Sequence, residues 1–203
     1  MSLFDNTYLI LLICVFFSIS HQSYAQDSWE IDKDKDGIKV YTKAEEGSDF
    51  KSFKAVVNLP ATTDEILKIL QNADGYSEWY GFTKTSILLK QEKGVQYNYV
   101  ETEFPWPYRN RDMVYRMSVD TLNQEMIKIS LKGIPDYIPV KKGKVRMDKA
   151  EGYILLQPSV DSTEVIYVFH SEPGNKIPSW LANNSISELP FKTLSGLRKM
   201  LHQ

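Results

Sequence analysis

A run of strand-like segments at hairpin spacing dominates the sequence and restricts the folds open to it. The segments are rich in β-branched and aromatic residues, and short turns such as Glu92-Lys93-Gly94 and Glu151-Gly152 separate several of them. Consecutive strands joined by such turns pair as antiparallel hairpins. The sequence therefore predicts one long antiparallel sheet, with strands over residues 38–41, 50–59, 85–91, 95–104, 112–121, 126–133, 144–149, 152–158 and 163–171.

Two helices are predicted around this sheet. Thr62 and Glu65 can form a capping box, which indicates the start of a helix of about ten residues. From Pro178 onward, apolar residues recur every three or four positions, which predicts one long amphipathic helix with a kink at Pro190. A curved sheet of about seven to nine strands wrapped around this C-terminal helix gives an α+β helix-grip fold with an internal hydrophobic cavity.

The strand that begins at Arg111 places a charged side chain at the head of an apolar row. Side chains alternate between the faces of a strand, so Arg111 shares one face with Met113, Tyr115, Met117 and Val119. The alternate residues of 112–120 have the character of a solvated face. A buried cation needs a partner, which leaves two interpretations. Arg111 either pairs with a nearby carboxylate as a structural residue or anchors a polar group in a mostly apolar cavity.

The residues just before this strand add aromatic and acidic candidates. Pro105 and Pro107 restrict the backbone around Trp106, so this loop is expected to be stiff and to lie at the rim of the sheet. In the preceding strand, one face carries an aromatic row that two carboxylates continue, formed by Val95, Tyr97, Tyr99, Glu101 and Glu103.

The N-terminus carries the pattern of a secretory signal peptide. Residues 8–19 form an apolar run in which Ser18 is the only clearly polar side chain, and Ser23-Tyr24-Ala25 offers a cleavage site after Ala25. The run is too short to cross a hydrocarbon core of ~30 Å comfortably. We therefore expect residues 1–25 to be a signal peptide and residues 26–203 to be a single exported domain, in the periplasm or otherwise outside the cell.

Composition excludes several classes of protein. Cys14 is the only cysteine and lies in the predicted signal peptide, so the mature domain is expected to fold without disulfides or thiolate metal sites. The 24 Lys and Arg residues nearly balance the 26 Asp and Glu residues, which is not the basic footprint of a nucleic-acid-binding protein. We expect a monomer with no nucleic-acid partner.

A segment that begins like a calcium-binding loop does not complete the pattern. Asp32, Asp34, Asp36 and Gly37 match the opening positions of such a loop, but Lys43 stands where a bidentate Glu should close the coordination sphere. We interpret this segment as a charged turn that enters the first strand, and we expect no metal site.

Candidates for enzyme chemistry are few. Of the three histidines, His21 belongs to the predicted signal peptide and His202 lies near the C-terminus, so only His170 stands within the predicted sheet. A metal cluster or a Ser-His-Asp arrangement cannot be assembled from this set. We interpret His170 as a structural strand residue and expect neither catalytic residues nor a cofactor.

Four groups of residues, in order along the chain, resemble the START (steroidogenic acute regulatory protein-related lipid transfer) domain family. The resemblance covers about residues 27–202. The groups are Gly37-Ile38-Lys39-Val40-Tyr41; Pro105-Trp106-Pro107 with Arg111-Asp112-Met113-Val114; Ile134-Pro135-Asp136 with Gly143-Lys144-Val145-Arg146; and Glu172-Pro173-Gly174 through Ile177-Pro178-Ser179-Trp180-Leu181-Ala182-Asn183.

The resemblance implies a helix-grip protein that holds one hydrophobic ligand, such as a sterol, a phospholipid or another lipid, in a tunnel closed by the C-terminal helix and nearby loops. The inward arginine of the family falls on Arg111. Sterol-binding members place an acid on the adjoining strand, whereas residues 83–86 offer none, so Glu101 or Glu103 would have to substitute for it.

We expect a lipid ligand, transient contact with a membrane, and gating by residues 105–110 and 134–137. The alternative is a helix-grip enzyme of the cyclase or hydrolase type, in which Arg111 and Glu101 would act on a hydrophobic substrate. The expected ligand-binding residues are Trp79, Tyr97, Tyr99, Glu101, Trp106, Arg111, Met113, Tyr115, Met117, Trp180 and Leu181.

Overall fold

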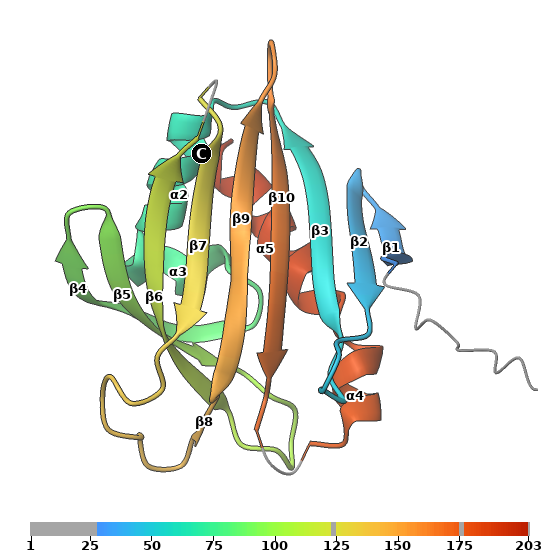
Figure 1. The fold of residues 1–203 in the computed structure, drawn as a ribbon, viewed down its shortest axis with the longest axis vertical. Coiled ribbons are helices and arrows are strands. Elements are labelled where there is room, and N and C mark those ends of the chain that lie inside the picture. Colours follow the sequence, from blue (N-terminus) through green and yellow to red (C-terminus); the bar gives the residue numbers. More distant parts are fainter. Residues whose placement is uncertain (1–27, 123–124, 175–176, 203) are drawn as a thin grey trace, which may run out of the picture.

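The computed structural model describes residues 28–122, 125–174 and 177–202 (Figure 1). The predicted signal peptide, residues 1–25, lies outside the described residues. No helix in the described ranges is long and apolar enough to cross a membrane.

A single ten-stranded sheet forms the body of the protein and confirms the predicted α+β helix-grip fold. The strands follow the order β1-β2-β3-β10-β9-β7-β6-β5-β4, all antiparallel, while the short β8 pairs in parallel with β6. The strands are β1 Glu30–Lys35, β2 Ile38–Lys43, β3 Ser52–Leu59, β4 Thr83–Glu92, β5 Val95–Thr102, β6 Arg111–Thr121, β7 Ile127–Gly133, β8 Val145–Arg146, β9 Lys149–Pro158 and β10 Thr163–Glu172.

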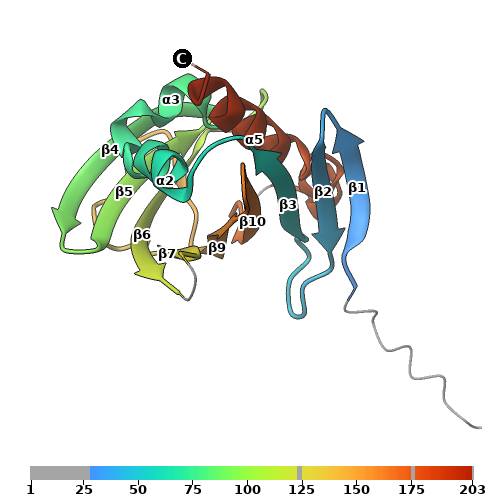
Figure 2. The ribbon, with the colours of Figure 1, turned by 90° about the horizontal axis from the view of Figure 1, so that it is seen from above.

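The sheet curves strongly, and its concave side is covered by helices (Figure 2). After β3 the chain passes through α2 (Thr63–Gln71), the 3₁₀ turn η1 (Ala73–Gly75) and α3 (Tyr76–Trp79) before it enters the far edge strand β4. The capping box predicted at Thr62 and Glu65 is present at the start of α2.

The C-terminal segment forms two helices, so the prediction of one kinked helix was wrong. α4 spans Ser179–Asn184 and α5 spans Glu188–Met200. Pro190 lies in the first turn of α5, where the missing N–H costs no helical hydrogen bond. A continuous helix would bring the proline ring against the carbonyl of Ile186, and the helix is instead interrupted just before α5.

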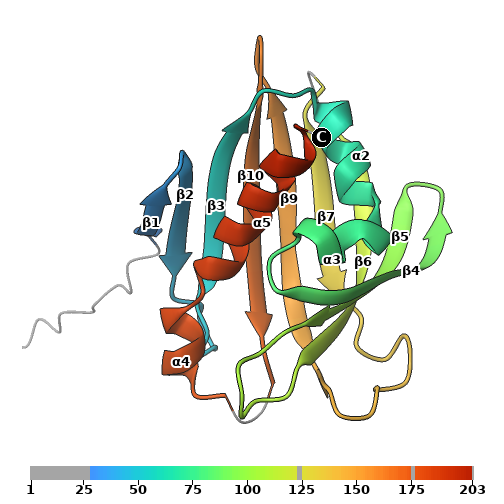
Figure 3. The same ribbon diagram turned by 180° about the vertical axis from the view of Figure 1, so that it is seen from behind.

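α5 crosses the concave face of the sheet and packs closely on α3 (Figure 3). Gly196 permits this contact, because a Cβ at this position would overlap with the carbonyl oxygen of Trp79. Leu194 and Leu197 of α5 are 2% and 1% exposed and join the core of the sheet.

Two expectations about the strands were also wrong. Glu151-Gly152 is not a turn but part of the uninterrupted strand β9, where Gly152 has no room for a Cβ beside the Val168 carbonyl of β10. The charged segment that begins at Asp32 lies mostly in β1, and only Asp36 and Gly37, both with positive φ, form the turn into β2.

Candidate ligand-binding cavity

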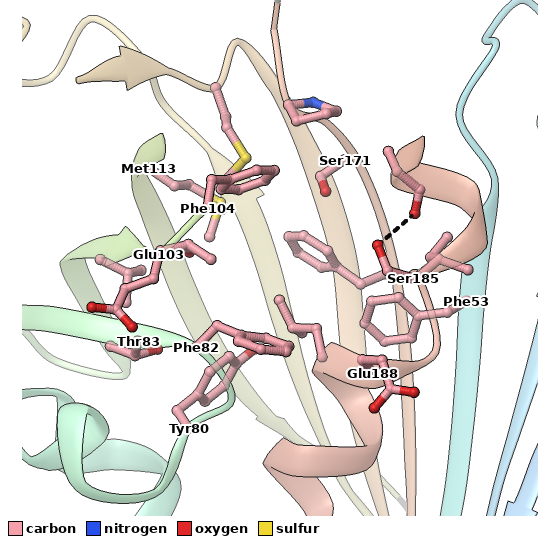
Figure 4. A pocket seen from close by; sticks show the side chains of 18 of the residues that line it. Phe53, Tyr80, Phe82, Thr83, Glu103, Phe104, Met113, Ser171, Ser185 and Glu188 are labelled. Atoms are coloured by element: carbon pink, nitrogen blue, oxygen red, sulfur yellow. Dashed lines mark hydrogen bonds between the residues drawn. The ribbon is translucent and has the colours of Figure 1, made fainter. Parts of the chain in front are cut away.

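An internal cavity of about 730 Å³ lies between the concave face of the sheet and the C-terminal helices (Figure 4). Its lining comes mainly from strands β5, β6, β7 and β10, from α4 and α5, and from the segment after β5. Aromatic and aliphatic side chains dominate this lining, as they do in sites for hydrophobic small molecules. Representative lining residues are Phe53, Tyr80, Phe82, Val100, Phe104, Met113, Ile129, Ile154, Phe169 and Leu189.

Four of the expected ligand-binding residues line this cavity. Met113, Tyr115 and Met117 belong to the inward row of β6, as the alternation of that strand predicted, and Leu181 comes from α4. Their placement agrees with the prediction. Contact with a ligand stays a prediction for all four residues.

The aromatic row of β5 faces away from the cavity, contrary to the prediction. In the β5–β6 register, Asn98 lies opposite Tyr115 and Val100 lies opposite Met113, so the even-numbered residues of β5 share the inward face. Tyr97, Tyr99 and Glu101 therefore lie on the outer face, and none of them lines the cavity.

The connection between β7 and β8 covers this outer face. Tyr137 stacks on Tyr97 with ring centroids 4.8 Å apart, and Lys141 Nζ lies 3.6 Å from the centroid of the Tyr99 ring. Tyr137 is therefore held against the convex side of the sheet, so a gate at the cavity mouth formed by residues 134–137 is not supported.

Glu101 is bound within the same outer cluster. Its carboxylate lies 2.5 Å from Lys144 Nζ and accepts a hydrogen bond of 2.7 Å from Asn110 Nδ2. Burial alone would raise the pKa of Glu101, but the hydrogen bonds from Asn110 and Lys144 outweigh it and hold the pKa below its ordinary value. Glu101 is thus a structural carboxylate in this arrangement.

The outer row of β6 is not fully solvated, which corrects a second expectation. Asp112 is 0% exposed, and its two carboxylate oxygens accept hydrogen bonds of 3.0 and 3.1 Å from Nε and Nη2 of Arg146. Arg146 also donates to backbone carbonyls of the β7–β8 connection, including that of Ile138 at 3.1 Å. This buried ion pair fastens the connection to the outside of the sheet.

Arg111 is buried beside the cavity without a carboxylate partner among the described residues. It is 1% exposed, and its Nε donates a hydrogen bond of 2.9 Å to the carbonyl oxygen of Pro173. Its Nη1 donates to the carbonyl oxygen of Arg109. Burial lowers the pKa of Arg111, and the nearby charge of Arg109 lowers it further. The predicted alternative of a structural pair with Glu101 or Glu103 is not formed.

An aromatic ring separates Arg111 from the lining. The guanidinium carbon lies 4.6 Å from the centroid of the Phe104 ring, and Phe104 lines the cavity while Arg111 does not. In this conformation Arg111 ties the end of β10 to the loop before β6, and a role as a ligand anchor stays a prediction.

The remaining candidates lie outside the cavity. Trp79 packs in an aromatic cluster with Tyr76 and Tyr80, whereas Trp106 and Trp180 are 93% and 63% exposed. His170 lies on β10 next in sequence to the lining residues Phe169 and Ser171, and alternation places it on the opposite, outer face. Its interpretation as a structural strand residue fits this position.

Sequence reasoning missed several lining residues, above all Tyr167 and Phe169 on β10. That strand is apolar on both faces, so its alternation gave no signal of which row faces inward. Tyr80 follows the short helix α3 and Phe104 follows β5, so neither lies in a strand whose alternation could indicate the direction of its side chain.

Comparison with known proteins decides the family. The family model described as START domain matches residues 18–203 of the chain. The chain belongs to the START domain family. The resemblance noted in the sequence is thereby confirmed over nearly the whole described domain.

Individual proteins are similar to the chain over most of its length. The chain is 35% identical over 191 residues to the uncharacterised protein PA1579 of Pseudomonas aeruginosa, with 94% of each protein covered. It is 23% identical over 162 residues to the rat phosphatidylcholine transfer protein, covering 76% of this chain and 75% of the relative. The crystal structure of a STAR-related lipid transfer protein from Xanthomonas axonopodis is 41% identical, covers 87% of this chain and 100% of that one, and superposes with a TM-score of 0.83.

Proposed function

We propose that this START protein is exported, binds one lipid in its internal cavity and carries that lipid between membranes. The observation that supports it most is the cavity of about 730 Å³, because a lining so rich in apolar side chains favours a hydrophobic occupant. Relatives named as lipid transfer proteins support lipid binding at the level of the family. Export to the periplasm is proposed from the sequence pattern of residues 1–25 alone.

Two exposed tryptophans support transient contact with a membrane. Trp106 follows Pro105, and Trp180 precedes Leu181; Pro105 and Leu181 both line the cavity. An indole ring exposed to solvent is well suited to the interface between lipid headgroups and water. We propose that the cavity opens near these two side chains and that this opening faces the bilayer, so that a lipid passes without crossing bulk water. We propose that the protein acts as a monomer.

The alternative function, a helix-grip enzyme, depended on Arg111 acting together with Glu101. Glu101 lies on the outer face and binds Lys144 and Asn110, whereas Arg111 binds backbone carbonyls beside the cavity. No observation on these residues favours that enzyme over lipid carriage, and we propose no reaction.

A substitution at the proposed opening of the cavity tests the proposed transport. Ala182 of α4 lines the cavity, so Ala182→Trp is expected to obstruct the opening and slow transfer of a pyrene-labelled lipid between donor and acceptor vesicles severalfold. The matched control is Asn184→Trp on the same helix, because Asn184 is exposed and does not line the cavity. Equal transfer rates for both variants and the wild type, or no transfer by the wild type, would contradict the proposal.

A further inference from the structure

Four tyrosines from separate parts of the chain gather in the lining of the cavity. Tyr76 comes from α3, Tyr80 follows it, Tyr115 lies on β6, and Tyr167 lies on β10; we call them the tyrosine cluster. The rings of Tyr76 and Tyr80 stack with centroids 5.4 Å apart, and those of Tyr80 and Tyr167 are 6.5 Å apart. The cluster thus gives an otherwise apolar cavity a concentration of hydroxyl groups.

The hydrogen bonds of Tyr76, Tyr80 and Tyr167 leave one hydroxyl hydrogen available among these three residues. The Tyr76 hydroxyl donates to the carbonyl oxygen of Leu70, and the hydroxyls of Tyr80 and Tyr167 bond to each other. A tyrosine hydroxyl carries a single hydrogen. The bond between Tyr80 and Tyr167 uses one of their two hydrogens, and neither hydroxyl makes another hydrogen bond within the described residues. The second hydrogen therefore needs an acceptor, which a ligand oxygen in the cavity can supply.

A second observation points to the same region. Asn98 is 1% exposed and lies opposite Tyr115 on the inward face of β5, where its amide interacts with the Tyr115 hydroxyl but makes no hydrogen bond of good geometry among the described residues. A buried amide without partners costs free energy unless water or a ligand satisfies it. Asn98 does not itself line the cavity, so it adds a buried, uncharged polar group beside Tyr115 next to the tyrosine cluster.

No charged side chain forms a hydrogen bond with the tyrosine cluster among the described residues. Among the described lining residues, the ionic side chains belong to Lys51, Lys84, Glu103 and Glu188, and each is partly or fully exposed. Burial raises the pKa of Tyr115 to about 12 and raises those of the other three tyrosines, so all four hydroxyls stay protonated at neutral pH. An anionic headgroup placed here would lose its hydration without gaining a cation.

We propose that the cavity takes an uncharged lipid that carries a hydroxyl or carbonyl oxygen, with this oxygen bound at the tyrosine cluster. The proposal rests on the proposed lipid-binding function and specifies the class of ligand. It also gives the ligand a direction, because the polar end is buried against Tyr80 and Tyr167 and the apolar body fills the rest of the cavity.

Displacement of Nile red from the delipidated protein tests this proposal. Hexadecanol, hexadecanoic acid and hexadecane share a chain length and differ only at one end. We expect hexadecanol to bind more tightly than hexadecanoic acid at pH 8. The double variant Tyr80→Phe with Tyr167→Phe should lower the affinity for hexadecanol about fivefold to tenfold, which is the effect expected for the loss of one hydrogen bond. The affinity for hexadecane should stay unchanged. Each single variant keeps one hydroxyl with a free hydrogen and should lose less.

Tyr97→Phe is the matched control, because Tyr97 lies on the outer face of the sheet and should not affect any of these ligands. Equal or tighter binding of hexadecanoic acid to the wild type, or wild-type hexadecanol affinity in a folded double variant, would overturn the proposal. Tighter one-to-one binding of dipalmitoyl phosphatidylcholine would also overturn it. If the double variant does not fold, the single variants and the preference of the wild type for alcohol over acid decide. If none of the ligands binds, hexadecane included, the result would instead contradict the proposed lipid-binding function.

Discussion

Deletion of residues 178–203 is expected to abolish cooperative folding. α5 covers the concave face, and its Leu194 and Leu197 are almost completely buried. Loss of these two side chains alone would cost about 4–10 kcal/mol, a large part of the total stability of about 5–15 kcal/mol typical of a domain. The exposed concave face would also form an apolar patch that promotes aggregation.

Thermal unfolding followed by circular dichroism, together with size-exclusion chromatography, measures this effect. The control is a deletion of residues 202–203 only, which follow α5 and should leave unfolding unchanged. A chain without residues 178–203 that stays monomeric and unfolds cooperatively would show that the C-terminal helices are not part of the fold's core.

The second large effect is expected for Arg146→Met. Asp112 is completely buried, so loss of the guanidinium leaves an uncompensated carboxylate inside the protein, at a cost of about 3–5 kcal/mol. The double variant Arg146→Met with Asp112→Leu removes both charges and should recover much of the loss. Urea unfolding at neutral pH measures both free energies.

Lys132→Met supplies the control for this ion pair. Lys132 pairs with Glu151 between neighbouring strands, but both side chains are largely exposed, so its removal should change stability little. An Arg146→Met protein as stable as Lys132→Met would mean that Asp112 gains solvent or another partner. The covering of the outer face by the β7–β8 connection would then be weaker than its contacts suggest.

The sequence predicted the class of fold and one wall of the cavity. In β6 only one of the two alternating rows is predominantly apolar, so the inward row could be assigned. Met113, Tyr115 and Met117 form an apolar row, and this row does face inward. In β5 alternation separated the two rows correctly, but the more aromatic row was assigned to the wrong face. Tyr97 and Tyr99 are covered by a connection that lies about forty residues further along the chain, and local pattern carries no information about such long-range cover.

The surroundings of Arg111 were also hidden in the sequence. A carboxylate pair was one of its two expected interpretations, but no such pair forms among the described residues, and backbone carbonyls of Arg109 and Pro173 bind it. Every residue has a backbone carbonyl, so the sequence does not show which carbonyl will accept a given hydrogen bond. The tyrosine cluster likewise depends on tertiary structure. Its hydroxyl groups come from tyrosines in or beside α3, β6 and β10, and the local sequence around each tyrosine does not indicate that they meet.

Gentle-ionisation mass spectrometry of the full protein, purified without detergent from the cells that make it, tests the central claim most directly. We expect the folded protein to carry one lipid per chain, and a denaturing spectrum of the same sample to release that lipid unchanged. A mature chain beginning at Gln26 would support export in the same spectrum. A folded protein that shows only the mass of the bare chain, under conditions in which a known lipid carrier keeps its ligand, would contradict the account.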